Sequence, residues 1–449
     1  MSDAADYPED TIVAAATPPG RGGVGIVRLS GPKAGDILTA MAGDLPTARY
    51  ATYRQFVDAD GRSMDSGLVL WFPGPDSFTG ESVAELHGHG GPVVMSLLID
   101  TAIQLGARRA EPGEFSRRAF LNGRLDLVQA EAIADLIDSG TTQAARAAHR
   151  SLSGAFSVAV NKLTEQLIRL RLHVEAAIDF PDEDIDFLAD DALQAEVRTC
   201  KAAFDELTTR AGAGRLLRDG LQVVIVGKPN AGKSSLLNQL SGQEAAIVTE
   251  VAGTTRDVLR EHIDVGGLSV ELIDTAGLRE NPDTIEAEGI RRARKALASA
   301  DAVLWIQDAA ADEQATPDEA LPDVPVLILR NKTDLTGDKA GLVSDAPMVL
   351  NVSAKTGEGL EDLRAALLRL AGYRDAGEGA FTARQRHVDA LEQAQGHFET
   401  GREALDKDRA GEIFAEELRL AQEALTGITG EFTSDDLLGR IFAEFCIGK

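Results

Sequence analysis

A short apolar segment that runs directly into a glycine- and lysine-containing loop limits the fold of this chain more than any other feature. The segment LQVVIV leads into GKPNAGKSS, residues 227–235, which matches the pattern GxxxxGK[ST] between a strand and a helix. The two glycines let backbone amides curl around an anion at a helix start, Lys233 brings a positive charge to the phosphates, and the Ser234 hydroxyl can bind Mg²⁺. The sequence therefore predicts a phosphate-binding loop on a parallel α/β sheet.

Three further motifs follow this loop in the order that a guanine-nucleotide site requires. DTAG, residues 274–277, ends an apolar strand, where its aspartate can hold the Mg²⁺ shell and its glycine can sense the γ-phosphate. NKTD, residues 331–334, and SAK, residues 353–355, each follow a strand, and doubly wound sheets bind ligands at such ends. The Asp334 carboxylate only accepts hydrogen bonds, so it matches the paired N–H donors of guanine and rejects adenine by roughly 10⁴-fold. Together the motifs predict GTP binding and hydrolysis.

The expected GTP contacts come from the phosphate loop, from these three motifs and, by resemblance to the switch region of a GTPase family, from the segment that follows the loop. They are Asn230, Ala231, Gly232, Lys233, Ser234, Ser235, Thr249, Glu250, Val251, Ala252, Gly253, Thr254, Thr255, Asp274, Thr275, Ala276, Gly277, Asn331, Lys332, Asp334, Ser353, Ala354 and Lys355. Ras-like GTPases, which this segment resembles, usually place a water-orienting Gln directly after DTAG, but the residue here is Leu278. Hydrolysis therefore needs another route.

Charge and cysteine content bound the partners and the compartment. With 45 Lys and Arg against 72 Asp and Glu, the net charge is −27, the opposite of what a protein holding nucleic acid by its own field would show. We therefore expect no DNA binding and only local or shared contacts with RNA. Cys200 and Cys446 are too few for a disulfide framework, the N-terminus is acidic where a signal peptide would be basic, and no apolar run approaches roughly 18 residues. We expect a soluble cytoplasmic protein with no membrane segment.

The periodicity of apolar residues divides the chain into four segments. Residues 1–120 alternate short apolar stretches with Gly/Pro turns, as in a small α/β domain, and residues 121–217 read as helices. Strands and helices alternate over residues 218–378, and helices return over residues 379–449. Because domain termini often lie close together, we expect a Ras-like P-loop GTPase domain inserted into one helical domain. The fold class is thus multidomain, α/β plus all-α.

Motifs along nearly the whole chain resemble the bacterial tRNA-modification GTPases of the MnmE (TrmE) family. They include ATPPGRGGVGIVRLSG, HGHGGP, PGEFSRRAFLNGRLDL, IVTEVAGTTRD, EAAIDFPDEDIDF and the terminal EFTSDDLLGRIFAEFCIGK. The resemblance implies a potassium-stimulated GTP hydrolase that acts as a homodimer with a flavin-dependent partner, MnmG, in a heterotetramer. Together they would add a carboxymethylaminomethyl or aminomethyl group at C5 of the wobble uridine of tRNA. A tetrahydrofolate derivative, 5-formyl or 5,10-methylene, would supply the one-carbon unit, with FAD on the partner.

The resemblance also assigns ions and a catalytic residue to the nucleotide site. It implies that Ser234 and Thr255 bind Mg²⁺, and that four residues supply oxygens to K⁺: Asn230, Thr249, Val251 and Thr254. A K⁺ beside the phosphates would stabilise developing charge where other systems use an arginine finger. The family's water-orienting glutamate aligns with Glu286, with Asp283 and Glu288 as its nearest rivals.

The family's N-terminal domain resembles folate-binding enzymes, and its folate contacts fall on Arg28, Glu85, Arg124 and Lys449. Cationic side chains suit the glutamate tail of folate, and a carboxylate suits the donor-rich edge of a pterin. Some members have Lys at the position of Arg124, which keeps the charge but changes the geometry. The C-terminal helix is expected to be docked. That would bring Cys446 near the folate as a catalytic thiol or, equally, as a small residue in a packed helix end.

Two competing interpretations remain at the level of the sequence. The chain could be a regulatory switch in ribosome assembly with no chemistry of its own, although such a switch needs neither the folate segment nor the terminal CIGK. His87 and His89 have a spacing that could bind a metal, but no Cys or His cluster accompanies them. A glycine-rich turn leading to Pro92 is the expectation for that segment.

Overall fold

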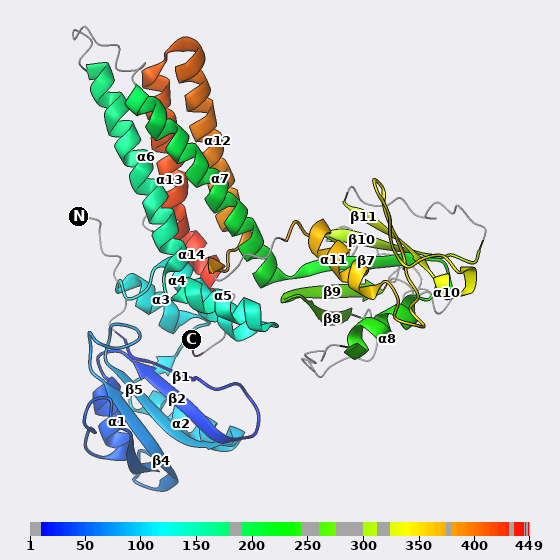
Figure 1. Cartoon of the computed structure of the whole chain (residues 1–449). Helices are drawn as coiled ribbons and strands as arrows, with labels where there is room; N and C mark the ends of the chain where they lie inside the picture. Colours follow the sequence, from blue (N-terminus) through cyan, green and yellow to red (C-terminus); the bar gives the residue numbers. More distant parts are fainter. Residues whose placement is uncertain are drawn as a thin grey trace, which may run out of the picture. The chain divides into compact units, whose positions relative to one another are not determined.

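The computed structural model divides the chain into two compact units, Met1–Ala134 with Glu423–Lys449, and Asp135–Gln422 (Figure 1). It describes residues 10–179, 191–243, 260–274, 300–311, 324–373, 379–430, 435–443, 445 and 448. Among these residues, no helix has both the length and the apolar content needed to cross a membrane.

The first unit is built on a six-stranded sheet with the order β3-β4-β5-β2-β1-β6. Its strands are β1 (Ile12–Ala15), β2 (Gly22–Ser30), β3 (Thr52–Val57), β4 (Ser63–Phe72), β5 (Val83–Gly90) and β6 (Arg108–Arg109). All neighbours are antiparallel except β1 and β6. The core of one face joins Val27 and Leu86 to residues of helices α1 (Ala34–Ala42) and α2 (Pro92–Gln104). Since strand side chains alternate, Arg28 and Glu85 belong to the opposite face.

The HGHG segment lies in strand β5, so the expectation of a turn there was wrong. The glycines serve close approach of neighbouring chain rather than a change of direction. A Cβ at position 88 would lie 2.5 Å from Oδ2 of Asp65, and one at position 90 would lie 2.7 Å from the carbonyl oxygen of Val24. The histidines contact two different carboxylates, His87 with Glu85 and His89 with Asp65. The segment is therefore an inner strand with small residues.

The C-terminal helix α14 (Asp435–Ala443) packs on α3 (Glu114–Leu121) and α4 (Leu127–Asp138). Leu438, Ile441 and Phe442 are buried with Leu127 and Ala130. The Phe442 ring lies 6.4 Å from that of Phe120 and 5.4 Å from that of Phe445, centroid to centroid. The prediction that this helix is docked is confirmed for the described residues.

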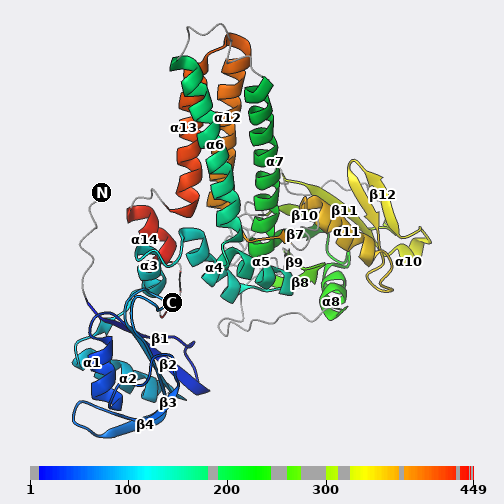
Figure 2. The same cartoon turned by 60° about the vertical axis from the view of Figure 1, so that its left-hand side comes forward.

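Helices on both sides of residues 218–378 form one bundle, of which the residues up to Gln422 belong to the second unit. They are α5 (Thr142–Leu152), α6 (Ala155–Asp179), α7 (Asp191–Asp219), α12 (Gln385–Asp408) and α13 (Gly411–Thr429). Four of them, α6, α7, α12 and α13, run side by side in both views (Figures 1 and 2). Phe398 of α12 joins the earlier and later helices, because its ring lies 5.3 Å from that of Phe204 and 6.2 Å from that of Phe414. The α/β segment is therefore an insertion in a helical domain.

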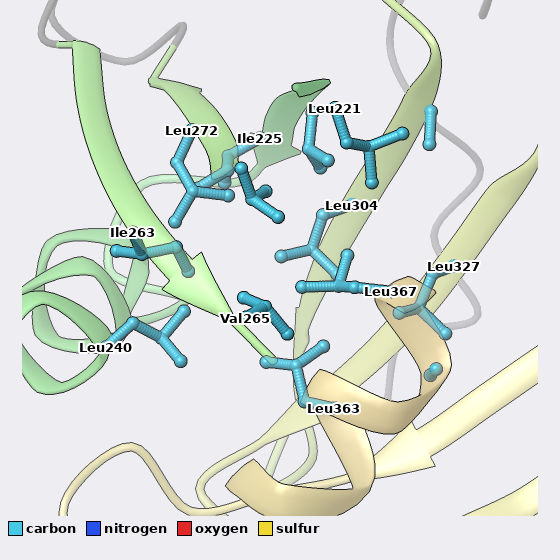
Figure 3. Packing of buried hydrophobic residues seen from close by; sticks show 14 of the residues in the cluster. Leu221, Ile225, Leu240, Ile263, Val265, Leu272, Leu304, Leu327, Leu363 and Leu367 are labelled. Atoms are coloured by element: carbon cyan, nitrogen blue, oxygen red, sulfur yellow. The ribbon is translucent and has the colours of Figure 1, made fainter. Parts of the chain in front are cut away.

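The inserted segment is a seven-stranded sheet with the order β12-β13-β11-β10-β7-β9-β8. Its elements are β7 (Leu221–Gly227), α8 (Lys233–Gln243), β8 (Arg260–Val265), β9 (Leu268–Asp274), β10 (Ala302–Asp308), β11 (Val326–Asn331), α10 (Thr333–Thr336), β12 (Gly341–Asp345), β13 (Met348–Asn351) and α11 (Leu360–Leu370). The five inner strands are parallel, and only β8 and β12 are antiparallel to their neighbours. Leu240, Leu363 and Leu367 join the sheet residues in one core (Figure 3). The carboxyl ends of the parallel strands consequently share one edge.

An ion-pair network at the end of α4 holds both connections between the helical bundle and the inserted sheet. Oδ1 of Asp135 accepts hydrogen bonds from Nε of Arg218, at 2.9 Å, and from Nη2 of Arg384, at 3.0 Å. Arg218 precedes β7 and Arg384 precedes α12, so one carboxylate holds the chain where it enters and where it leaves the insertion. The network gives the insertion two anchored ends.

Candidate functional site

The phosphate loop joins β7 to α8 with its lysine turned inward. Lys233 is 7% exposed, and its ammonium donates hydrogen bonds to the carbonyl oxygens of Gly227, at 2.8 Å, and Lys228, at 2.9 Å. Asn230 and Gly232 have φ angles of 65° and 98°, which bend the backbone so that its amides can point toward an anion. The loop thus combines a helix start, curled backbone and one cation, as the sequence predicted for binding phosphates.

A buried asparagine fastens the phosphate loop to the base-binding loops. Asn331 ends β11, is 2% exposed, donates from Nδ2 to the carbonyl oxygen of Ala231 at 2.9 Å and accepts at Oδ1 from the amide of Ala354 at 2.9 Å. A Cβ at Gly232 would lie 2.2 Å from the Asn331 amide nitrogen, so this contact also requires glycine. Asn331 therefore sets the distance between the phosphate end and the base end of the site.

Asp334, the aspartate that the sequence predicts to select guanine, is exposed and accepts a hydrogen bond from a hydroxyl. Ser353 Oγ, which is buried, donates to Oδ1 of Asp334 at 2.7 Å. Lys332, beside it, has a φ of 69° and pairs through Nζ with Oδ2 of Asp308 at 2.6 Å. The hydrogen bond from Lys332 lowers the pKa of Asp308. The structure thus brings together the NKTD and SAK motifs, with Asp334 open to a base.

The two residues that the sequence predicts near Mg²⁺ come after or at the end of neighbouring strands. Ser234 is exposed in the first turn of α8, which the phosphate loop joins to β7. Asp274 ends β9, and the parallel register pairs its backbone with that of Ile225 of β7, two residues before the phosphate loop. Mg²⁺ prefers oxygen ligands and usually keeps substrate phosphates among them. The Ser234 hydroxyl is thus an oxygen donor of the kind that a magnesium ion carried by a nucleotide would use.

A second group of polar residues lies on the sheet face opposite α1 and α2. Arg28 and Glu85 face each other in the register of β2 and β5, and Nε of Arg28 donates to Oε1 of Glu85 at 2.9 Å. Nε2 of His87 lies 3.0 Å from Oε2 of the same carboxylate. Burial acts to raise the pKa of Glu85, but the bond to His87 and the charge of Arg28 outweigh it and lower the pKa. Glu85 is therefore a partly buried carboxylate with a partner on each oxygen.

Two aromatic rings border this ion pair. The Arg28 guanidinium carbon lies 5.5 Å from the ring centroid of Phe78 and 5.8 Å from that of Phe115. Aromatic faces beside a carboxylate and a cation can hold a flat heterocycle with polar edges.

Known relatives match both the ends and the middle of this chain. The family described as GTP-binding protein TrmE N-terminus matches residues 11–124, and the MnmE helical domain family matches residues 127–446. Proteins named tRNA modification GTPase MnmE from Erwinia tasmaniensis and Proteus mirabilis are 55% and 54% identical over 98% of this chain and 99% of their own. The chain belongs to the MnmE family of tRNA modification GTPases.

Among solved structures, the G domain of the T. maritima FeoB iron transporter is 24% identical to this MnmE family member. It covers 34% of this chain and 98% of its own, with a TM-score of 0.25, too low for any further comparison.

Several predicted residues of this MnmE family member lie outside the described residues. They are Thr249, Glu250, Val251, Ala252, Gly253, Thr254, Thr255, Thr275, Ala276, Gly277, Glu286, Cys446 and Lys449, together with Leu278, Asp283 and Glu288.

The two remaining folate candidates are Arg124 and the C-terminus. Arg124 is exposed and lies 4.0 Å from Asp76, and its Cγ lies beside Gly80, in the loop that carries Phe78. Gly448 lies against β1, because a Cβ there would come within 2.0 Å of the carbonyl oxygen of Ala15. The residue before Lys449 is thus close to the strand that pairs with β2.

Sequence reasoning missed two residues in this MnmE family member. Asp308 forms an ion pair with Lys332. It ends the strand AVLWIQD, and a carboxylate at the end of a parallel strand could have been predicted to belong to the site. His87 contacts Glu85, and its spacing of two residues along a strand, which puts both on one face, could have indicated the pair.

Proposed function

We propose that this tRNA modification GTPase hydrolyses GTP with stimulation by K⁺ and acts with a flavin-dependent, MnmG-like partner. Together they add a carboxymethylaminomethyl or aminomethyl group at C5 of the wobble uridine of tRNA, and a tetrahydrofolate derivative supplies the one-carbon unit. The observation that carries the proposal is the match along 98% of the chain to relatives named tRNA modification GTPase MnmE. That match argues against a pure switch in ribosome assembly.

In this proposal each segment of the chain has one task. Residues 1–120 bind tetrahydrofolate and form a homodimer, residues 218–378 bind GTP, and the helical segments 121–217 and 379–449 connect them. The two subunits of the homodimer join two partner subunits, each of which carries FAD, in a heterotetramer. The net charge of −27 favours a shared RNA site, because an acidic chain repels phosphates unless a basic partner contributes.

The nucleotide site supports hydrolysis by charge stabilisation. Lys233 lies inside the phosphate loop, Ser234 follows it with a hydroxyl for Mg²⁺, and Asp274 ends the neighbouring strand β9. K⁺ would supply further positive charge next to the phosphates, in the role that an arginine finger has elsewhere. We assign it to Asn230, Thr249, Val251 and Thr254, Mg²⁺ to Ser234 and Thr255, and the orientation of water to Glu286.

The sheet face with Arg28 and Glu85 supports a folate site. Glu85 can accept the adjacent N–H donors of a pterin, since an ionised carboxylate has two acceptor oxygens. Arg28, Arg124 and Lys449 can hold negative charge on the ligand, and Phe78 offers a ring for stacking. Cys446 is the thiol that we assign to the vicinity of the ligand.

Replacing Asn230 by Gly tests the potassium site. Glycine adopts the φ of 65° without strain, so the change removes only the side-chain amide. We expect the stimulation of GTP hydrolysis by K⁺ over Na⁺ to fall by roughly tenfold, while the rate in Na⁺ changes little. The assay compares initial rates of phosphate release in KCl and NaCl. Asn238→Ala, which removes an exposed amide from α8, should keep the full stimulation. Equal stimulation in Asn230→Gly and the native protein would contradict the assignment.

A further inference from the structure

The proposed folate site contains a histidine that competes for its central carboxylate. Oε1 of Glu85 accepts from Arg28 at 2.9 Å, and Oε2 is bonded to Nε2 of His87 at 3.0 Å. The side chains of Glu85 and His87 are 14% and 23% exposed, so water screens the pair only in part. A ligand with two adjacent N–H donors needs both oxygens of the carboxylate, each of which can accept two hydrogen bonds. It must therefore share Oε2 with His87, as it shares Oε1 with Arg28.

The strength of that bond depends on the charge of the imidazole. A neutral imidazole donates an ordinary hydrogen bond, whereas an imidazolium donates a charge-assisted bond that is roughly twice as strong. Histidine side chains change charge between about pH 5 and pH 8. A proton on His87 therefore strengthens its bond to Oε2 of Glu85 and leaves this oxygen a weaker acceptor for a neutral N–H donor.

The strands around His87 bring few other charges to it. The residue opposite it on β2 is Ile26, and the residues opposite His87 and Glu85 on β4 are Leu68 and Leu70. Tyr53 lies opposite Leu68 on β3 and is 68% exposed, and its phenol stays neutral near pH 7. Among the paired strands, Glu85 and Arg28 are thus the charged side chains on this face next to His87.

We propose that His87 is a specificity-determining residue that makes binding of the pterin ring at Glu85 dependent on pH. The ring binds more tightly when His87 is neutral, because a protonated His87 competes with the ring for Oε2 of Glu85. This inference rests on the proposed folate site, and it adds a proton-controlled residue to that site.

The test measures binding of 5-formyltetrahydrofolate to the full-length protein at pH 5.5 and pH 7.5 by titration calorimetry. For the native protein we expect the Kd to be roughly tenfold higher at pH 5.5, because a protonated His87 donates a stronger bond to the carboxylate that the ring must share. In His87→Gln, and in His87→Asn as a second neutral replacement, the Kd should change by less than about threefold. His89→Gln is the matched control, because His89 lies two residues further along β5 but pairs with Asp65. It should keep the tenfold change.

The outcomes separate this inference from the function on which it rests. The same pH dependence in His87→Gln as in the native protein would overturn the role of His87 while leaving folate binding intact. Loss of binding at pH 7.5 in both His87 variants would also overturn it, since His87 would then be required rather than competing. Absence of binding by the native protein at pH 7.5 would overturn the folate site itself, and the inference with it.

Discussion

Asp334→Asn is expected to weaken GTP binding by roughly 10³- to 10⁴-fold and to create binding of xanthosine triphosphate. Asp334 is exposed beside the base-binding loops, with Oδ1 held by the hydroxyl of Ser353 at 2.7 Å. The lone pairs that remain on the Asp334 carboxylate can accept two N–H donors of guanine. An amide in its place presents an N–H to one of these donors, which is then left without an acceptor. Xanthine carries a carbonyl at the same ring position, which accepts from the amide. Equilibrium binding of labelled GTP and xanthosine triphosphate measures both effects.

Asp338→Asn is the matched control for this exchange. Asp338 lies four residues further along, is exposed and accepts a hydrogen bond from Thr336 at 2.8 Å. It should bind GTP as the native protein does. Native affinity for GTP in Asp334→Asn would show that another residue selects the base.

Arg118→Met is expected to destabilise the first unit by about 3–5 kcal/mol, because it removes a fully buried cation from three carboxylates, of which Glu114 is itself buried. The Arg118 side chain is fully buried and donates to Asp10 at 2.7 Å, Glu81 at 3.0 Å and Glu114 at 2.9 Å. Amide hydrogen exchange in β1, β2 and β5 measures the loss locally, which avoids assuming one transition for a chain of two units.

Arg109→Met controls for the same change of side chain at the surface. Arg109 and Asp100 are 64% and 55% exposed and 2.8 Å apart, so their ion pair is worth less than about 1 kcal/mol. Its exchange rates should stay close to native. Equal protection in Arg118→Met and Arg109→Met would contradict the buried network.

The same network predicts how the first unit responds to acid. Burial acts to raise the pKa of Glu114, but hydrogen bonds from Arg108, the Glu111 amide and Arg118 outweigh it and lower the pKa below 4.5. A carboxyl whose pKa is lowered by folding stabilises the fold at neutral pH and loses that contribution as the pH falls below its unfolded value. Native protein should therefore lose protection below about pH 4.5 more steeply than Arg118→Met.

The GTPase segment could be predicted from the sequence because its strands are buried on both faces. Such strands read as unbroken apolar runs, and LQVVIVG, AVLWIQD and PVLILR each form the expected strand. The motifs then follow from local spacing, since each comes at a strand's end.

Other features depended on contacts that are distant in the sequence. The glycines of the HGHG segment predict a turn before Pro92, but they lie in strand β5 and serve close approach to Asp65 and Val24, which only the sheet reveals. Nothing in the pair Arg117–Arg118 tells which arginine is buried, and its partner Asp10 comes from 108 residues away. The bridge through Asn331 likewise joins Ala231 and Ala354 across the fold.

The claim that GTP hydrolysis by this chain serves the modification of wobble uridine is tested most directly by mass spectrometry of tRNA nucleosides. The tRNA would come from cells that lack the protein and carry either the native gene or Lys233→Ala, which removes the ammonium from the phosphate loop. We expect the nucleosides with a carboxymethylaminomethyl or aminomethyl group at C5 to return with the native gene and to stay absent with Lys233→Ala. Their presence at native levels in cells without the protein, or with Lys233→Ala, would contradict the claim.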